Sequence, residues 1–214
     1  MDIFMSLMKS LFTLPLIALF FSCQGQSRGP KPTTMDQNTQ TAIFAGGCFW
    51  CTEAVFLEID GVKKVEPGYI GGTTVNPTYK EVTTGTTGHA EAIMINFDPS
   101  KVTYGELLEI FFATHDPTTL NRQGNDVGTQ YRSEVFYLNE DQKKLATDYI
   151  ALLDKENTYG KKVVTKVSAA TKFYPAEDYH HNYYAQNKLQ PYCFYVITPK
   201  VEKVRTKYRE KLKK

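Results

Sequence analysis

Residues 42–56, "AIFAGGCFWCTEAVF", contain two cysteines, Cys48 and Cys51, with Phe49 and Trp50 between them. Trp50 is the only tryptophan of the chain. Cysteine thiolates serve as nucleophiles, as redox partners and as zinc ligands, and this spacing fits all three uses. The segment therefore predicts thiol chemistry. Three interpretations stay open: a thioredoxin-like redox pair, half of a zinc site, or one nucleophile in an apolar pocket beside an incidental second thiol.

The expected secondary structure around Cys48 favours a nucleophile. Residues 41–46 have the pattern of a short apolar strand, two glycines break it, and residues 49–59 have helical spacing. Cys48 is therefore expected at a helix N-terminus, where unpaired N–H groups and the helix dipole stabilise a thiolate and lower the pKa of the thiol. Cys51 lies one turn further along and gains less from this effect.

The other candidate metal ligands do not support a zinc site. His180 and His181 are adjacent, so only one of them could share a helix face with a further ligand. Cys193 is far along the chain from the first two cysteines, whereas structural zinc sites are usually built from two short paired motifs. We therefore expect no metal.

Length and composition describe an ordinary globular domain. The chain has 214 residues, of which 42% are hydrophobic and 22% charged, enough for a single domain with a substantial core. Its formal net charge of +2 is nearly balanced and gives no reason to expect a nucleic acid or an acidic polymer as partner. We expect a monomer that acts on a small molecule or a side chain.

The N-terminus has the pattern of an export signal. Lys9 precedes the apolar run "LFTLPLIALFFSC", which has the length of a signal peptide and is too short to span a bilayer. Ser22 before Cys23 resembles a bacterial lipoprotein cleavage site, in which Cys23 would carry the lipid anchor. Phe20 and Phe21 make this match loose, so an ordinary cleaved signal and an uncleaved anchor stay open.

These features predict the organisation of the chain and its location. We expect a lipoprotein-like signal peptide at residues 1–22, a flexible polar tether at 23–40 and the folded domain at 41–214. The protein would then be exported to the bacterial cell envelope and lipid-anchored on the periplasmic side. If the N-terminus is misread, the location would be the cytoplasm.

The folded domain alternates between strand and helix patterns. Beyond the first strand and helix, strands are expected at residues 89–97, 133–138 and 162–167, and helices at residues 103–115, 141–155, 176–189 and 200–214. Two long loops rich in Gly, Asn and Thr, at 68–91 and 115–133, are expected to carry function. The fold class is therefore α+β: a single domain with a mixed β-sheet, packed helices and long functional loops.

Eight motifs recur in an order that resembles one known family. They are "GCFWCTE", "GYIGG", "NPTYKEV", "TGHAEAI", "DP…YGELLEIFF", "HDPTTLNRQGNDVGTQYRS", "FYPAEDYHHNYY" and "PYC". Together they look like the A-type peptide-methionine (S)-S-oxide reductases over roughly residues 42–205. The resemblance implies a ferredoxin-like α/β sandwich core. It also implies that the domain at 41–214 reduces the S epimer of methionine sulfoxide, free or in oxidised proteins.

The resemblance implies roles for the reacting groups. Cys48 matches the nucleophile that attacks the sulfoxide, and Glu91 matches the carboxyl group that donates the proton. Glu91 should therefore be partly desolvated, with a raised pKa. Tyr79 and Tyr131 match the hydroxyls that hydrogen-bond the sulfoxide oxygen as charge develops on it.

The resemblance also implies the substrate-binding groups. Phe49 and Trp50 would form the apolar pocket for the methionine methyl group, with the indole as a large flat surface. Asp126 and His180 match positions that line or brace the site. Taken one at a time, each of these residues is more often structural than functional.

Recycling in this family passes through a disulfide. After the attack Cys48 would be a sulfenic acid, which condenses with a resolving thiol, and a thioredoxin-like dithiol donor then reduces the disulfide without any cofactor. We favour Cys193, in "PYC", as the first resolving thiol, because a disulfide between Cys48 and Cys51 would have to form beside the bulky pocket residues. Cys51, where many members carry glycine, would be a second relay or inert.

Two other functions remain as alternatives. A general thiol-disulfide oxidoreductase would use the Cys-Phe-Trp-Cys pair, but it gives no reason for "TGHAE" or "NDVGTQYRS". A lipid-anchored binding protein could hold a thioether in the aromatic pocket without chemistry. Survival of function in Cys48→Ser would support the binding protein.

Overall fold

The computed structural model describes residues 38–214. The expected signal peptide, the expected lipid anchor at Cys23 and most of the expected tether lie outside the described residues. Strand β1 begins at Gln40, where the expected tether ends. Within residues 38–214, no helix is long and apolar enough to cross a membrane.

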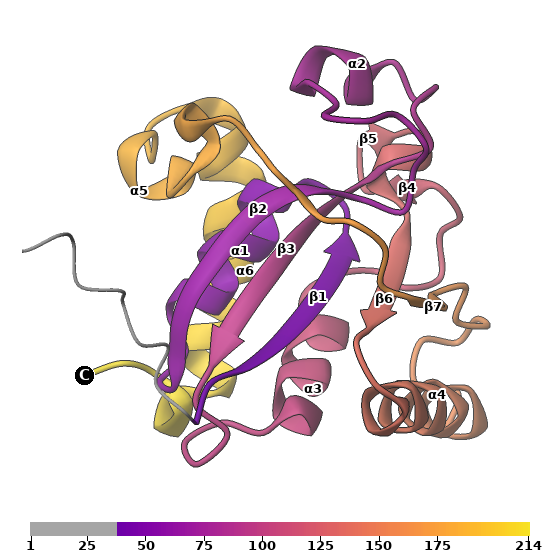
Figure 1. The fold of residues 1–214 in the computed structure, drawn as a ribbon. Helices are drawn as coiled ribbons and strands as arrows, with labels where there is room; N and C mark the ends of the chain where they lie inside the picture. Colours follow the sequence, from indigo (N-terminus) through magenta and orange to yellow (C-terminus); the bar gives the residue numbers. More distant parts are fainter. Residues whose placement is uncertain (1–37) are drawn as a thin grey trace, which may run out of the picture. The chain divides into compact units, whose positions relative to one another are not determined.

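A six-stranded sheet with the order β7-β6-β1-β3-β2-β8 forms the centre of the domain (Figure 1). Neighbouring strands are antiparallel except for β6 and β7, which are parallel. The order β6-β1-β3-β2, connected as β1-α1-β2-β3-α3-β6, is the ferredoxin-like arrangement. The strands are β1 (Gln40–Gly46), β2 (Val62–Ile70), β3 (Ala90–Phe97), β6 (Ser133–Tyr137), β7 (Lys166–Ala169) and β8 (Tyr174–Pro175).

Helices and a small ribbon complete the domain. The helices are α1 (Phe49–Leu57), α2 (Tyr79–Thr83), α3 (Tyr104–Thr114), α4 (Glu140–Lys155), α5 (Tyr183–Gln186) and α6 (Thr198–Lys207). Strands β4 (Arg122–Gln123) and β5 (Asp126–Val127) pair separately from the main sheet. Shorter helical turns are the 3-10 helices Thr129–Tyr131, Asp178–His180 and Arg209–Lys211, and the π-helix Cys193–Ile197.

The sheet has a different apolar core on each face. Along β1, Ala42 and Phe44 belong to the main core, which they share with α1, α3 and α6, while Ile43 and Ala45 point to a smaller core on the other face. This alternation is the period of two expected of a strand. The ring of Phe44 lies 4.9 Å from that of Phe111 on α3. Helix α1 is therefore fixed on the sheet by its own core residues, which places its N-terminus at the end of β1.

Most of the predicted elements are confirmed within a few residues. The short helix α2 and the two-residue strands β4, β5 and β8 were not predicted, and α6 ends at Lys207, before the predicted end of the last helix. Two longer regions also differ. Strand β2 was not predicted, because "VKKVEPGYI" contains two lysines and a proline and lacks a clear alternation. The predicted helix at residues 176–189 is wrong. There the chain forms a 3-10 turn, a left-handed residue at Asn182 with φ of 52°, and the four-residue helix α5. A left-handed residue cannot continue a right-handed helix.

Candidate active site

Cys48 lies between the end of β1 and the start of α1, as predicted, and is the N-cap residue of that helix. Two glycines make this tight turn possible. Gly47 has a φ of +91°, and a side chain at Gly46 would lie 2.7 Å from the ring of Phe111. Only 7% of Cys48 is exposed. The turn therefore places the thiol in the apolar interior at the end of the sheet.

The predicted lowering of the Cys48 pKa is wrong. Burial raises the pKa of this thiol well above its usual value, and the neighbouring Cys51 thiol and the charge of Glu91 raise it further. The helix end does not compensate, because the backbone N–H of Phe49 is donated to Glu91 Oε2 at 3.1 Å. The resting Cys48 is therefore a neutral thiol.

Glu91, near the start of β3, has the buried environment that was predicted for it. It is 1% exposed, and burial raises its pKa to about 8, while the Phe49 N–H opposes the rise and the charges of Asp126 and Cys51 add to it. The predicted rise in pKa is confirmed. Because Oε2 accepts the backbone hydrogen bond, Oε1 is free to carry the proton.

Tyr79 on α2 and Tyr131 in the 3-10 helix Thr129–Tyr131 share this environment. Burial, and then the charge of Glu91, raise the pKa of both phenols well above the usual value, and the charge of Cys48 contributes to each. Both hydroxyls are therefore neutral donors close to Glu91 and Cys48. In Figure 1, α2, β4 and β5 lie together at the end of the sheet where β1 ends.

Phe49 and Trp50 differ in what they can do. Phe49 has no exposed surface, and its ring packs against those of Tyr79, at 6.3 Å between centroids, and His180, at 4.9 Å. Trp50 is partly exposed and stacks on Tyr183, with centroids 3.8 Å apart and planes 7° from parallel. Phe49 is therefore a buried ring against which the surrounding rings pack, whereas Trp50 presents an apolar surface that a substrate can reach.

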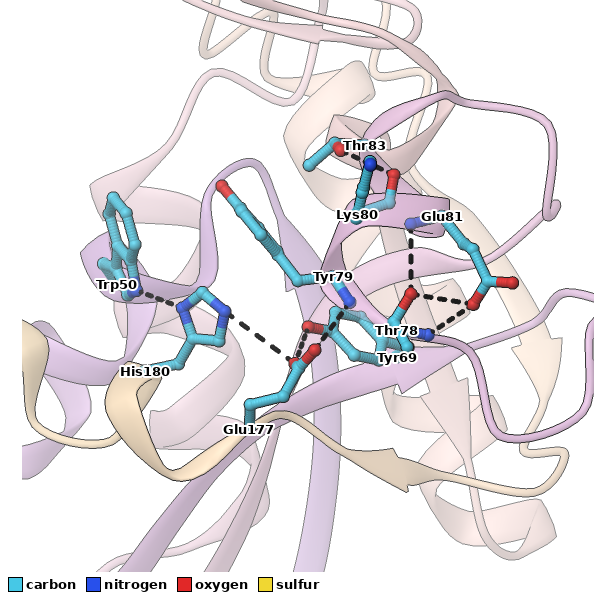
Figure 2. A network of polar contacts seen from close by, with 9 residues as sticks. All are labelled: Trp50, Tyr69, Thr78, Tyr79, Lys80, Glu81, Thr83, Glu177 and His180. Atoms are coloured by element: carbon cyan, nitrogen blue, oxygen red, sulfur yellow. Dashed lines mark hydrogen bonds and ion pairs between the residues drawn. The ribbon is translucent and has the colours of Figure 1, made fainter.

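His180 connects Trp50 to a network of polar contacts (Figure 2). The indole Nε1–H of Trp50 donates to His180 Nδ1 at 3.0 Å. His180 is fully buried, and burial lowers its pKa, so the ring is neutral and carries its proton on Nε2. This Nε2 lies 3.9 Å from Glu177 Oε2. His180 therefore braces Trp50 through the indole hydrogen bond.

The three cysteines in the described part of the chain are all free and buried. The charge of Cys51 raises the pKa of both Cys48 and Cys193, so Cys51 is the electrostatic neighbour of each. Interaction with Cys48, then Lys200 and the Tyr192 hydroxyl, lower the pKa of Cys51 itself. The Cys51 Sγ lies 3.7 Å from that hydroxyl. The Cys51 thiol therefore interacts both with Cys48 and with the Tyr192 hydroxyl.

Comparison with known proteins decides the family. The family model for peptide methionine sulfoxide reductase matches residues 40–212. The chain belongs to the peptide methionine sulfoxide reductase family. A relative from Deinococcus radiodurans named peptide methionine sulfoxide reductase MsrA is 54% identical over 190 residues, or 89% of this chain and 91% of that protein.

Solved structures agree with this family. Methionine sulfoxide reductase A of Corynebacterium diphtheriae superposes with a TM-score of 0.64 at 34% identity, covering 72% of this chain and 78% of that one. The reduced form of Mxr1 from Saccharomyces cerevisiae gives a TM-score of 0.69 at 32% identity, covering 73% and 90%. The α+β fold and the family resemblance are thereby confirmed. The chain is an oxidoreductase that reduces peptide methionine sulfoxide.

The methionine sulfoxide reductase site contains residues that sequence reasoning did not single out. Tyr192 donates to Asp126 Oδ2 at 2.6 Å, which places Asp126 beside Cys51. Glu53 of α1 is buried with its pKa raised to about 7 by burial, and its Oε1 accepts the backbone N–H of Asn182 at 2.9 Å. Glu177 is the third such residue. All three lie within or beside the quoted motifs, but nothing in one sequence distinguishes their side chains from surface tyrosines and glutamates.

No group of three or more His, Cys, Asp or Glu side chains that could hold a metal occurs among residues 38–214. His180 and His181 do not act together, because His180 is buried against Trp50 while His181 is half-buried outside this contact. The reductase site is thus built from thiols, carboxyl groups and aromatic rings.

Proposed function

We propose that this enzyme reduces the S epimer of methionine sulfoxide, free or in oxidised proteins, through a sulfenic acid on Cys48. The observation that carries the proposal is the buried Glu91, bound to the first backbone N–H of the helix that Cys48 caps. With a pKa of about 8, Glu91 holds a proton at neutral pH beside the nucleophile. A proton donor at this place is what removal of a sulfoxide oxygen from its sulfur requires.

The chemical step transfers the oxygen of methionine sulfoxide to Cys48. The Sγ of Cys48 attacks the sulfoxide sulfur, and Glu91 donates its proton to the sulfoxide oxygen. The oxygen passes to Cys48, methionine leaves, and the proton released by the Cys48 thiol returns to Glu91. Cys48 loses two electrons and becomes a sulfenic acid, and the methionine sulfur gains two electrons.

The surrounding residues have separate roles in this step. Tyr79 and Tyr131 donate hydrogen bonds to the sulfoxide oxygen, because both are neutral phenols close to Glu91. Trp50 forms the apolar surface for the methyl group, and Phe49 holds the rings behind it. Asp126, fixed by Tyr192, lines the side toward the thiols.

The disulfide forms first between Cys48 and Cys51. The sequence favoured Cys193 as the first resolving thiol, but the position of Cys51 favours Cys51 instead. Cys51 lies one turn along α1 from Cys48, and its thiol interacts with the Cys48 thiol. Condensation of the sulfenic acid with Cys51 releases water. Cys193 then attacks Cys51 and frees Cys48 as a thiol, and a thioredoxin-like dithiol reduces the remaining disulfide. This cycle uses no metal or prosthetic group.

The location of the enzyme is a separate proposal. It is supported by the signal-peptide pattern and by Ser22 before Cys23, and it places a lipid-anchored monomer in the bacterial cell envelope. The intact mass of the mature protein, purified from membranes, tests it. A mass that begins at Cys23 with a bound diacylglyceryl group supports the anchor, and a mass that begins at Met1 contradicts it.

The function itself is tested with the two separated epimers of a blocked methionine sulfoxide and dithiothreitol as reductant. We expect the S epimer to be consumed completely and the R epimer to remain. Consumption of the R epimer alone would contradict the proposed stereochemistry.

A further inference from the structure

Glu177 lies at the junction of β8 and the 3-10 helix Asp178–His180 and contacts three parts of the site. Its Oε1 accepts the backbone N–H of Tyr79 at 2.8 Å. Its Oε2 accepts the hydroxyl of Tyr69 at 2.8 Å and lies 3.9 Å from His180 Nε2 (Figure 2). The reaction described above uses none of these three contacts.

The hydrogen bonds fix the charge of this carboxyl group. Burial opposes ionisation, but the hydrogen bonds from Tyr79 and Tyr69 outweigh it and lower the pKa of Glu177. Glu177 is therefore a carboxylate at neutral pH. A carboxylate accepts hydrogen bonds on both oxygens at once, which this position requires.

The direction of each hydrogen bond around His180 is determined. An indole N–H can only donate, so His180 Nδ1 must be the acceptor of the bond from Trp50. The proton of the neutral ring is then on Nε2, a buried atom with no hydrogen-bond partner that faces the Glu177 carboxylate. The charge of Glu177 thus favours the one tautomer that can hold Trp50.

The contact with Tyr79 links Glu177 to helix α2. Tyr79 is the first residue of α2. The other hydrogen bonds at the N-terminus of this helix come from the capping box formed by Thr78 and Glu81. The bond from the Tyr79 N–H to Glu177 ties this five-residue helix to the segment that carries His180. The Glu177 carboxylate therefore contacts both the backbone of Tyr79 and His180, the residue that holds Trp50.

We propose that Glu177 is a positioning residue that sets the distance between the two walls of the substrate site, Tyr79 directly through its backbone and Trp50 through His180. The inference rests on the proposed function only where it takes Trp50 and Tyr79 as walls of that site. Small displacements of such groups cost large factors in rate, and a 1 Å error can cost about 10²-fold.

The sole tryptophan gives a readout that does not depend on activity. When His180 is protonated, Nδ1 can no longer accept the Trp50 N–H, and the cationic ring quenches the indole. The ionisable groups that face His180 are Glu177, Tyr179 and His181 from its own segment and Tyr79 from α2. From α1 it meets the rings of Phe49 and Trp50. Emission of Trp50 against pH therefore reports the protonation of His180.

The test compares Glu177→Gln with the matched control Glu81→Gln in the full-length protein. Both residues accept a backbone N–H at the start of α2, but only Glu177 faces His180. In Glu177→Gln the side-chain carbonyl can still accept the Tyr79 N–H, yet the side chain lacks the charge that favours protonation of His180. We expect the emission midpoint to move to lower pH by about half a pH unit or more in Glu177→Gln, and not in Glu81→Gln.

Kinetics complete the test. We expect Glu177→Gln to raise KM for the sulfoxide by about 10-fold, and Glu177→Ala, which also releases Tyr79, to lower kcat as well. An unchanged emission midpoint and unchanged KM in Glu177→Gln would overturn the inference, even if Glu177→Ala fails to fold. A shifted midpoint in Glu177→Gln, together with a wild-type enzyme that is inactive on both epimers, would keep this inference and refute the proposed function.

Discussion

Two regions meet at the N-terminus of α1 and are built in different ways. On the substrate side, Trp50 is held by a hydrogen bond to His180, by stacking on Tyr183 and, through His180, by Glu177. On the thiol side, the three cysteines are buried without a disulfide. The difference follows from what each region must do. Walls that distinguish two epimers need one fixed geometry, whereas thiols that exchange partners must be free to pair in turn.

The thiol side contains an irregular stretch of backbone at Cys193. Cys193 begins a π-helical turn, Cys193–Ile197, and its carbonyl accepts the Thr198 hydroxyl at 3.0 Å. π-helical turns occur frequently at functional sites. The exposed Phe194 and Tyr195 follow it directly, so the third thiol lies just beneath the surface at which an external dithiol must arrive.

The largest expected effect concerns the thiol side. Cys48→Ser should lower the single-turnover rate by at least about 10³-fold, because a hydroxyl neither attacks the sulfoxide sulfur nor takes up its oxygen. Rapid-quench measurement of methionine formation checks this. A rate within tenfold of the wild type would mean that another group is the nucleophile.

Glu91 connects the two regions, and its loss should have the next largest effect. Glu91→Gln should slow the chemical step by about 10² to 10⁴-fold. The wild-type rate should fall as the pH rises past about 8, where Glu91 loses its proton, and the variant should lack this decline. Single-turnover rates between pH 6 and 10 decide it, with Glu66→Gln, a half-buried glutamate paired with Lys64, as the control. A decline that persists in Glu91→Gln would remove Glu91 from the acid role.

A smaller effect is expected on the substrate side. Trp50→Ala should raise KM about 10-fold and change the single-turnover rate at saturation much less, because the lost surface binds the methyl group in the ground state and in the transition state alike. Saturation curves with the S epimer measure both quantities. An unchanged KM would mean that Trp50 only fills the core.

The last prediction concerns stability and not the rate. Glu91 has a pKa near 4.5 when unfolded and about 8 when folded, so between these values only the folded state keeps the proton. Its stabilising contribution is complete below pH 4.5 and is lost as the pH rises to 8, on the order of 5 kcal/mol in total. Urea unfolding at pH 5 and pH 8 should show Glu91→Gln gaining stability relative to the wild type at the higher pH. An equal difference at both pH values would contradict the raised pKa.

The reacting residues were easier to predict from the sequence than the residues that hold them in place. The helix start after Gly47 was predicted from local spacing, and Glu91 and the pocket rings from the resemblance. The thiol pKa was not predictable in this way, because it depends on burial and on Glu91, which is 43 positions from Cys48 and joins it only through the pairing of β1 with β3. The network of Glu177 was missed for the same reason, since its contacts with Tyr69 and Tyr79 span about a hundred residues.

The proposed reaction is tested most directly by one turnover of the reduced full-length enzyme with each epimer, stopped at successive times and mapped by mass for modified thiols. We expect methionine from the S epimer alone, an early disulfide between Cys48 and Cys51, and later a disulfide between Cys51 and Cys193. Methionine formed from the S epimer while Cys48 remains an unmodified thiol throughout would contradict it.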